Sequence, residues 1–207
     1  MIEFYTAGTH NGIRANIALA ESGLAYRVHK VTLATPLPER PADFLAATPF
    51  GRIPAIVDPD GPGGPIAVSQ SGAVMMYVAN KAGKLWPDDA RQRIVALQWL
   101  MHACSDTAVW NAVMNQAAMK MLPDESGALA EAVKSKRLMR WFGEADSQLA
   151  KTTYLSGPQC TLPDFALFPV ANQRRAWLEE SGLRHLTRWL DAMAARPGVQ
   201  KGLAESS

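Results

Sequence analysis

The sequence predicts two domains of different class, a small α/β domain followed by an all-α helical domain. Strand patterns alternate with helix patterns over residues 1–82, in the order βαβαββα. Beyond residue 89 the strand patterns stop and helical periodicity continues. A hydrophobic fraction of 48% is enough to build the core of a globular protein of 207 residues. We therefore expect domains at 1–82 and 89–207, joined by a linker at 83–88.

Charge and cysteine content exclude several classes of function. The chain carries 21 basic and 19 acidic residues, a net charge of +2, which is too balanced for a nucleic-acid or membrane-surface protein. Cys104 and Cys160 form no Cys-x-x-Cys pair, and His29, His102 and His185 show no ligand spacing, so no metal is expected. We expect these histidines to be surface or satisfied residues. No apolar run approaches the roughly 18 residues that span a bilayer, and no signal-peptide pattern is visible, so a cytoplasmic protein is predicted.

The first domain begins with a strand, a helix and a second strand. Ile2–Thr6 reads as a strand, and Asn11–Ser22 carries a helical apolar stripe that ends at Gly23. Tyr26–Leu33 alternates and predicts the second strand. A proline-rich loop then leads to a short helix at Ala42–Ala47.

A hairpin and a helix complete this domain. Ile53–Val57 predicts a strand, and the turn residues of Asp58–Gly64 predict a hairpin whose return strand includes Ile66–Val68. Ser71–Lys81 has a helical stripe of apolar residues and predicts the last helix of the domain.

The second domain opens with two long helix patterns. Asp88 is a candidate N-cap for a helix over Arg91–Met121, with a break expected near Ser105. Ser126–Lys151 predicts a second long helix.

Two shorter helices are predicted after these. Thr161 is followed three residues later by Asp164, the reciprocal capping pattern that precedes the apolar helix Phe165–Val170. We expect both capping residues to be structural. Leu183–Ala195 predicts a last amphipathic helix, stopped by Pro197.

A small polar loop connects the first strand to the first helix and contains Thr9 and Asn11. Both residue types cap helices well, so an ordinary N-cap is one interpretation. The other is an anion or thiolate site at the positive end of the helix.

Two further motifs carry similar alternatives. Pro54 at the start of a strand is either an ordinary trans edge proline or a cis residue. The cis form would turn the backbone of Ile53 outward to pair with a peptide ligand. After Gln70, Ser71 is one candidate for the N-cap of the next helix, and Ser69 is another. Alternatively, the hydroxyl and backbone N–H of Ser71 bind a carboxylate at the positive end of that helix.

Together these motifs resemble those of the glutathione transferases, over essentially the whole chain. The resemblance rests on Phe-Gly-Arg-Ile-Pro-Ala-Ile-Val-Asp at residues 50–58, Gln-Ser-Gly-Ala-Val at 70–74 and the capping box before Phe165. It implies a thioredoxin-like N-terminal domain that binds glutathione and a helical domain that carries the second-substrate side. Thr-x-Asn-Gly after the first strand is most similar to the bacterial Nu class, the disulfide-bond-reductase type.

The resemblance also implies roles for individual residues. Thr9 and Asn11 would contact and activate the glutathione sulfur, since this class has no catalytic tyrosine or cysteine. The implied contacts to the rest of glutathione are Arg52, Ile53 and Pro54 for the cysteinyl and glycyl portion, and Gln70 and Ser71 for the γ-glutamyl end. Glutamate is usual in the Nu class where this chain has Gln70.

Candidates for the second substrate and for dimerisation are fewer. Trp110, Met114 and Asn115 are placed late enough on the long helix to line an apolar pocket, although residues at helical spacing more often form core or a dimer interface. Phe50 resembles the aromatic dimer key of the animal classes and would be unusual on the surface of a monomer. A homodimer is therefore expected.

The resemblance implies an enzyme that uses glutathione as co-substrate and needs no metal. A bound thiolate would attack a disulfide or a small electrophile, with disulfide reduction slightly favoured and transferase or peroxidase activity alongside. One alternative is a non-catalytic glutathione-binding or regulatory protein on the same fold. Another is a dedicated isomerase or dehalogenase that differs in the helical pocket.

Overall fold

The computed structural model describes residues 1–118 and 132–206, which fall into two compact units. The first unit is Met1–Pro87 together with the residues from Ala194 onward, and the second is Asp88–Met193. The sequence predicts a helical domain over 89–207, whereas the structure assigns the end of the chain to the α/β unit.

A four-stranded mixed sheet with the order β2-β1-β3-β4 lies at the centre of the first unit. β1 (Ile2–Thr6) pairs in parallel with β2 (Tyr26–Lys30) and antiparallel with β3 (Ala55–Gly61). β4 (Gly64–Ser69) pairs antiparallel with β3 at the sheet edge. The predicted element order βαβαββα is confirmed.

The strand boundaries differ from those predicted. β2 ends at Lys30 rather than Leu33, because Lys30 is opposite Thr6, the last residue that β1 offers for pairing. β3 begins at Ala55 rather than Ile53, because a proline at position 54 has no N–H to donate to the ladder. The same strand continues through part of the predicted turn to Gly61, with a register irregularity on the way.

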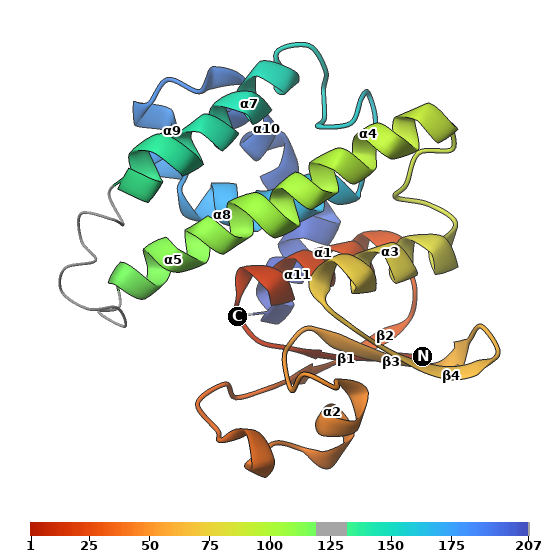
Figure 1. Ribbon diagram of the computed structural model, residues 1–207. Helices are drawn as coiled ribbons and strands as arrows, with labels where there is room; N and C mark the ends of the chain where they lie inside the picture. The colour runs from red at the N-terminus through yellow and green to blue at the C-terminus, as the bar shows by residue number, and fades with distance from the viewer. Residues whose placement is uncertain (119–131, 207) are drawn as a thin grey trace. The chain divides into compact units, whose positions relative to one another are not determined.

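Helices cover both faces of this sheet (Figure 1). α1 (His10–Ser22) and α3 (Ser71–Ala82) lie on one face, and the short helix α2 (Ala42–Ala47) lies on the other. Gly23 and Gly83 end α1 and α3 with φ values of 73° and 63°, the left-handed conformation in which glycine carries no steric penalty.

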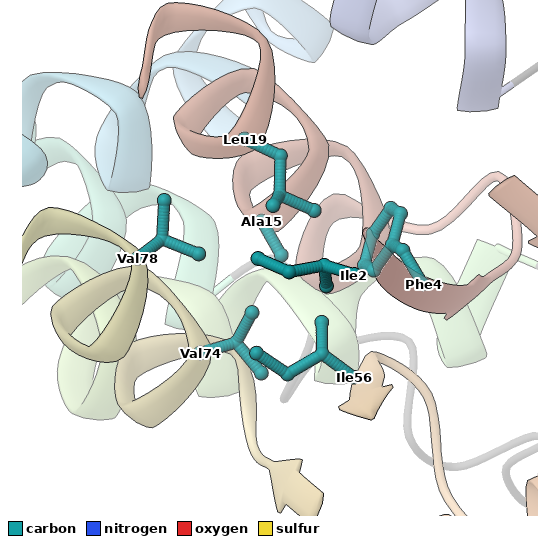
Figure 2. Close-up of a cluster of buried hydrophobic side chains, with 7 residues drawn as sticks. All are labelled: Ile2, Phe4, Ala15, Leu19, Ile56, Val74 and Val78. Atoms are coloured by element: carbon teal, nitrogen blue, oxygen red, sulfur yellow. The ribbon is translucent and has the colours of Figure 1, made fainter. Parts of the chain in front are cut away.

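The core of the first unit lies between the sheet and the helices α1 and α3. Figure 2 shows side chains from the strands pointing toward those of the two helices; the buried members are Ile2, Phe4, Ala15, Leu19, Ile56, Val74 and Val78. Full burial of each large aliphatic side chain contributes about 1.5–3 kcal/mol. This packing holds the strand ends, and the loops that leave them, in fixed positions.

A final helix, α11 (Pro197–Ser206), packs along α1 (Figure 1). The helix predicted to stop before Pro197 does end there, since α10 (Arg184–Ala194) stops at Ala194. The same proline also opens α11, where its missing N–H would be unpaired anyway. A Cβ on Gly202 would lie 2.8 Å from the Cα of Ile17, so this close approach requires glycine. Asn16 donates from Nδ2 to the Gly202 carbonyl at 3.2 Å. These contacts explain why the end of the chain belongs to the first unit.

The second unit begins with one long helical rod, drawn in green in Figure 1. It consists of α4 (Ala90–Met101), the π-helical segment η2 (His102–Thr107) and α5 (Ala108–Ala118). The break predicted near Ser105 is therefore a local change of helical pitch rather than an interruption. Met121, the predicted end of this helix, lies outside the described residues.

In the rest of this unit, the described residues form four further helices and a second π-helical segment. The predicted helix start at Ser126 also lies outside the described residues. The elements that the structure describes are η3 (Val133–Leu138), α7 (Met139–Leu149), α8 (Leu162–Gln173), α9 (Arg175–Glu180) and α10 (Arg184–Ala194). Among the described residues, none of the helices combines the length and apolarity needed to cross a membrane.

A capping box at Thr161 and Asp164 begins α8. The buried Asp164 carboxylate accepts the backbone N–H of Thr161 at 2.9 Å, the backbone N–H of Leu155 at 3.0 Å and Nε1–H of Trp189 at 2.9 Å. Burial raises the pKa of the Asp164 carboxyl to about 6, although these donors favour its ionised form. The residue therefore joins the helix start, the preceding loop and α10.

Candidate functional site

The sheet register brings the three predicted motifs to the same end of the sheet, where the strands begin or stop. Tyr5 is opposite Ala55, which is opposite Ser69 on the next strand. Because both pairs are antiparallel, the chain leaves β1, enters β3 and leaves β4 at the same end of the sheet. The residues that emerge there are Thr9 and Asn11 after β1, Arg52, Ile53 and Pro54 before β3, and Gln70 and Ser71 after β4.

Thr9 is the N-cap of α1. Its Oγ1 accepts the backbone N–H of Gly12 at 3.2 Å, and its backbone is extended, with φ −105° and ψ 158°. A Cβ on Gly12 would lie 2.2 Å from the Ala7 carbonyl oxygen, so the tight entry to the helix requires glycine. The N-cap interpretation is thus confirmed, and it leaves the hydroxyl hydrogen of Thr9 able to donate elsewhere.

Asn11 is exposed in the first turn of α1. Backbone N–H groups at this position have no partner within the helix, and the helix dipole makes this end positive. The Asn11 side chain therefore adds an amide donor to a region that already favours a negative group.

The Ile53–Pro54 peptide bond is cis. Ile53 precedes the β-ladder, which begins at Ala55, so its N–H and C=O are not committed to the sheet. Arg52 has an exposed side chain, and its backbone N–H donates to Thr48 Oγ1 at 3.4 Å.

Gln70 occupies the N-cap position of α3 with an unusual backbone. Its φ of 77° and ψ of 126° place a residue with a Cβ in a region that glycine normally occupies. The N-cap interpretation of Ser71 and Ser69 is wrong, because Gln70 holds that position and no side chain caps the helix. Such backbone strain is typical of ligand sites, and the uncapped N–H groups of α3 are left for a bound group.

Arg40 organises the loop that carries Phe50 and Arg52, a role that sequence reasoning missed. It follows the short 3-10 helix η1 (Leu37–Glu39). Its guanidinium donates to three backbone carbonyls, those of Thr35 at 3.1 Å, Leu33 at 3.0 Å and Gly51 at 3.0 Å. Nothing in the local sequence, an arginine in a proline-rich loop, indicates such a role.

The predicted second-substrate residues lie on α5 of the helical unit and have different neighbours. The Trp110 ring lies 6.4 Å from the ring of Trp141 on α7. Asn115 instead accepts Nη2–H of Arg174 at 2.7 Å, and Met114 is partly buried. Trp110 is therefore part of an aromatic contact between helices, whereas Asn115 belongs to a polar group.

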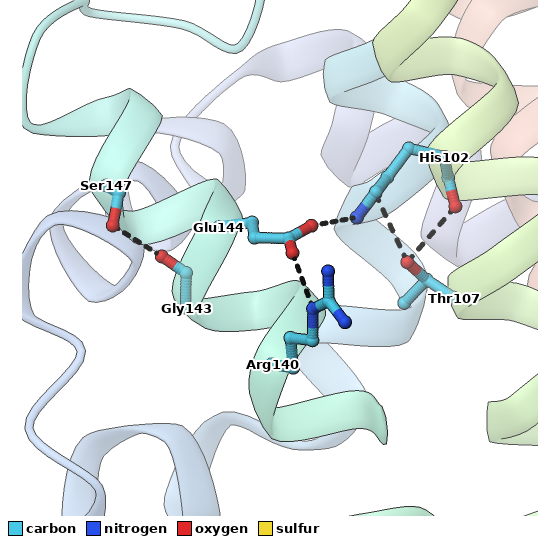
Figure 3. Close-up of polar contacts among 6 residues, drawn as sticks. All are labelled: His102, Thr107, Arg140, Gly143, Glu144 and Ser147. Carbon is cyan, nitrogen blue, oxygen red and sulfur yellow. Dashed lines mark hydrogen bonds and ion pairs between the residues drawn. The ribbon is translucent and has the colours of Figure 1, made fainter. Parts of the chain in front are cut away.

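His102 is partly buried and lies across from Glu144 of α7 (Figure 3). The expectation that it is a satisfied residue is wrong, because its buried Nε2 has no hydrogen-bond partner among the described residues. Glu144 Oε2 lies 3.8 Å from this atom, and Thr107 Oγ1 lies 3.4 Å from Nδ1. Burial lowers the pKa of His102, which favours the neutral imidazole.

Comparison with known families finds two matches that together extend over most of the chain. The model of the glutathione S-transferase N-terminal domain matches residues 10–81. The model of the glutathione S-transferase C-terminal domain matches residues 108–197.

Individual relatives match over nearly the full length. The disulfide-bond oxidoreductase YfcG of Escherichia coli is 29% identical over 212 residues, covering 100% of this chain and 96% of the relative. A glutathione transferase family member from Pseudomonas fluorescens, crystallised with two glutathione bound, is 29% identical with a TM-score of 0.87, covering 98% and 92% of the two chains. A glutathione transferase from Pseudomonas putida, with one glutathione disulfide bound per subunit, is 28% identical with a TM-score of 0.85, covering 98% and 90%.

Proposed function

The chain belongs to the glutathione S-transferase family, and we propose that it activates the thiol of glutathione for attack on a disulfide or an electrophilic carbon. Three loops meet at the same end of the sheet, and this observation is the main support for the proposal. Similarity over the full chain to a disulfide-bond oxidoreductase favours disulfide reduction. Glutathione is then a co-substrate, bound and consumed in each turnover.

Thr9 and Asn11 would stabilise the glutathione thiolate. A free thiol has a pKa of about 8.5, so only a few per cent is ionised at neutral pH. A hydrogen bond to a charged group contributes about 1.5–3 kcal/mol, and one pKa unit corresponds to about 1.4 kcal/mol. The Thr9 hydroxyl, the Asn11 amide and the N-terminus of α1 therefore suffice to lower the thiol pKa by about one to two units, without a protein base.

The remaining motifs would hold the rest of the tripeptide. The N–H and C=O of Ile53, next to the buried Pro54 and outside the ladder, would pair with the cysteinyl backbone as an added strand would. The uncapped N-terminus of α3, with Gln70 and Ser71, suits the α-carboxylate of the γ-glutamyl end. The exposed guanidinium of Arg52 suits the glycyl carboxylate.

Disulfide reduction would proceed in two exchanges. The thiolate of glutathione attacks one sulfur of the substrate, the S–S bond breaks, and the leaving thiolate takes a proton from water. A second glutathione thiolate then attacks the mixed disulfide at the glutathione sulfur, releasing the other thiol. One disulfide is reduced to two thiols while two glutathione molecules are oxidised to one glutathione disulfide.

Reduction of bis(2-hydroxyethyl) disulfide, coupled to glutathione reductase, tests this proposal. We expect turnover by the wild type and a loss of about tenfold or more in kcat/KM for Asn11→Ala. Asn80 is also exposed but lies on α3, so Asn80→Ala is the matched control and should retain activity. Absence of turnover in the wild type would rule out disulfide reduction and favour conjugation or binding alone. Equal activity in wild type and Asn11→Ala would remove Asn11 from the mechanism.

We also propose that the protein is a cytoplasmic homodimer. Phe50 is 59% exposed, and the helical unit exposes Ile94 at 60% and Val109 at 53%. In the proposed dimer a second subunit would cover Phe50, which resembles the aromatic dimer key of the animal classes. Cys104 and Cys160 are not joined in a disulfide, which fits a reducing compartment. A monomer mass by light scattering would reject the dimer.

A further inference from the structure

A cavity outside the glutathione motifs lies on the sheet face opposite α1 and α3, between α2 and the strands β1, β3 and β4 (Figure 1). Its volume is about 380 Å³, and its apolar walls include Ala46, Ala47, Val57, Ile66 and Ala67. This volume lies within the range of small-molecule sites, which is about 300–1,000 Å³. None of the residues that we propose to bind glutathione lines this cavity.

The sheet register explains which side chains face this cavity. Glu3 on β1 is opposite Val57 on β3, which is opposite Ala67 on β4. Side chains two residues apart on a strand share a face, so Tyr5 lies on the same side of the sheet as Glu3. The alanines of α2 and β4 that line the cavity are too short to fill the space between helix and sheet. The hollow is therefore built by small residues on both of its sides.

Tyr5 contributes a hydroxyl to the cavity. The residue is only 5% exposed, and its ring is held by His29, with centroids 4.9 Å apart, and by Phe44, with centroids 5.9 Å apart. In the part of the chain that the structure describes, the hydroxyl has no hydrogen-bond partner, yet it is not a fully enclosed polar atom. Buried polar groups normally have a partner. The Tyr5 hydroxyl is thus fixed in position and available to a molecule bound in the cavity.

Two carboxylates make the cavity electronegative. That of Glu3 already contacts Nε2 of His29 at 2.5 Å and lies 3.9 Å from Arg27. Asp43 on α2 is exposed, and no cation pairs with it among the described residues. Burial raises the pKa of the Tyr5 hydroxyl, and the charges of Asp43 and Glu3 raise it further. The hydroxyl therefore lies in a negative potential, which favours a cation and disfavours an anion.

We propose that this cavity binds a small organic cation, a primary ammonium group carried on an apolar body. The ammonium would donate to the Asp43 carboxylate and the Tyr5 hydroxyl oxygen, and Glu3 would add negative charge. An ammonium has three donors and no acceptor, which matches polar groups that can all accept. The apolar walls favour an amine with a hydrocarbon body over a bare ion. Such a site lies beyond the proposed function, because it neither holds glutathione nor takes part in the sulfur chemistry.

Three ligands with the same phenylethyl body test the role of charge. At neutral pH 2-phenylethylamine is a cation, 2-phenylethanol is neutral and 3-phenylpropionate is an anion. Titration followed by ¹H–¹⁵N NMR gives each dissociation constant, and shifts of the Ala46 and Ala67 amides locate the ligand. We expect the amine to bind about tenfold or more tightly than the alcohol, and the carboxylate more weakly than either. Equal affinity for the amine and the alcohol would overturn the inference, as would a dissociation constant above about 10 mM for the amine.

Variants of the polar groups identify which of them hold the ammonium. Asp43→Asn should weaken binding of 2-phenylethylamine by about tenfold or more, because it removes the unpaired charge. Tyr5→Phe removes only the hydroxyl and should weaken binding by about threefold or more. It should not lower the free energy of unfolding, because no hydrogen bond to the described residues is lost. Glu39→Gln is the matched control: it changes an exposed acid on η1 that does not line the cavity, and it should keep the wild-type affinity.

The outcomes for these variants decide between a built site and general attraction. If Asp43→Asn and Glu39→Gln weaken binding equally, the amine responds to overall surface charge and the inference is overturned. Unchanged affinity in Asp43→Asn or in Tyr5→Phe would overturn it too. None of these measurements uses the reductase reaction, so the proposed function can fail while this site stands, and the reverse.

Discussion

The hydroxyl oxygen of Thr9 accepts the backbone N–H of Gly12 at 3.2 Å, which closes the first turn of α1. A hydroxyl that accepts through oxygen still has its hydrogen to donate. The helix cap and the proposed thiolate donor are therefore the same group, and the cap fixes the direction in which the hydroxyl lies. The two interpretations of this loop are compatible rather than alternative.

Substitutions at Thr9 separate the shape of the side chain from its hydroxyl. Thr9→Val keeps the shape and removes the hydroxyl, so we expect a loss of about 1 kcal/mol of stability and at least tenfold in kcat/KM for disulfide reduction. Thr9→Ser keeps the hydroxyl and should retain most of the stability and most of the activity. Urea unfolding and the coupled reductase assay measure the two effects. Full activity in Thr9→Val would exclude the hydroxyl from thiolate stabilisation.

Two helical glycines should respond to alanine with opposite signs. At Gly202 a Cβ would lie 2.8 Å from the backbone of Ile17, so Gly202→Ala should destabilise the protein by about 1–3 kcal/mol. At Gly143 in α7 a Cβ would meet nothing within 4 Å, so Gly143→Ala should stabilise by about 0.5–1 kcal/mol. Thermal and urea unfolding of both variants check this. Equal effects at the two sites would show that the approach of α11 to α1 is not close.

Asp164 should be among the most sensitive positions in the helical unit. Asp164→Asn leaves one acceptor oxygen for the N–H groups of Thr161, Leu155 and Trp189, so we expect a loss of about 3 kcal/mol. Asp191→Asn makes the same chemical change at a side chain that is 66% exposed and should stay within about 1 kcal/mol of the wild type. Urea denaturation measures both. If Asp164→Asn leaves the free energy of unfolding unchanged, the buried N–H groups are satisfied in another way.

The partly buried His102 should make stability depend on pH. Burial lowers its pKa in the folded state, and nearby Asp106 and Glu144 offset this only in part. The unfolded residue titrates near 6.5, so below that pH the unfolded state binds more protons and the free energy of unfolding falls. The contribution of His102 is complete above about pH 6.5 and is lost as pH falls toward its folded pKa.

His102→Gln removes this titration. We expect the wild type to lose more stability than His102→Gln between pH 7.5 and 5.5, measured by urea unfolding at each pH. Arg140, which contacts the Glu144 carboxylate at 2.9 Å, remains in both proteins, so the difference reports on His102 itself (Figure 3). Parallel curves for the two proteins would show that His102 does not titrate differently on unfolding.

Local patterns predicted most elements of this fold because their causes are local. The alternation over Ile2–Thr6, the glycine at position 23 and the spacing of Thr161 and Asp164 act within a few residues. Boundaries were less predictable, because pairing partners decide them. β2 ends where β1 has no further residue to pair with it. The sequence of β2 alone does not indicate where that point lies.

By itself, the sequence determined the order of strands and helices, the three polar motifs and the family, since periodicity, turn chemistry and short motifs are written in neighbouring residues. Only the tertiary structure decided that the last helix joins the first unit, that Gln70 rather than Ser71 holds the N-cap position of α3, and that Asp191 pairs with Arg175. The physical reason is that burial and charge compensation depend on residues distant in sequence. Those partners are brought together by packing, which no local pattern encodes.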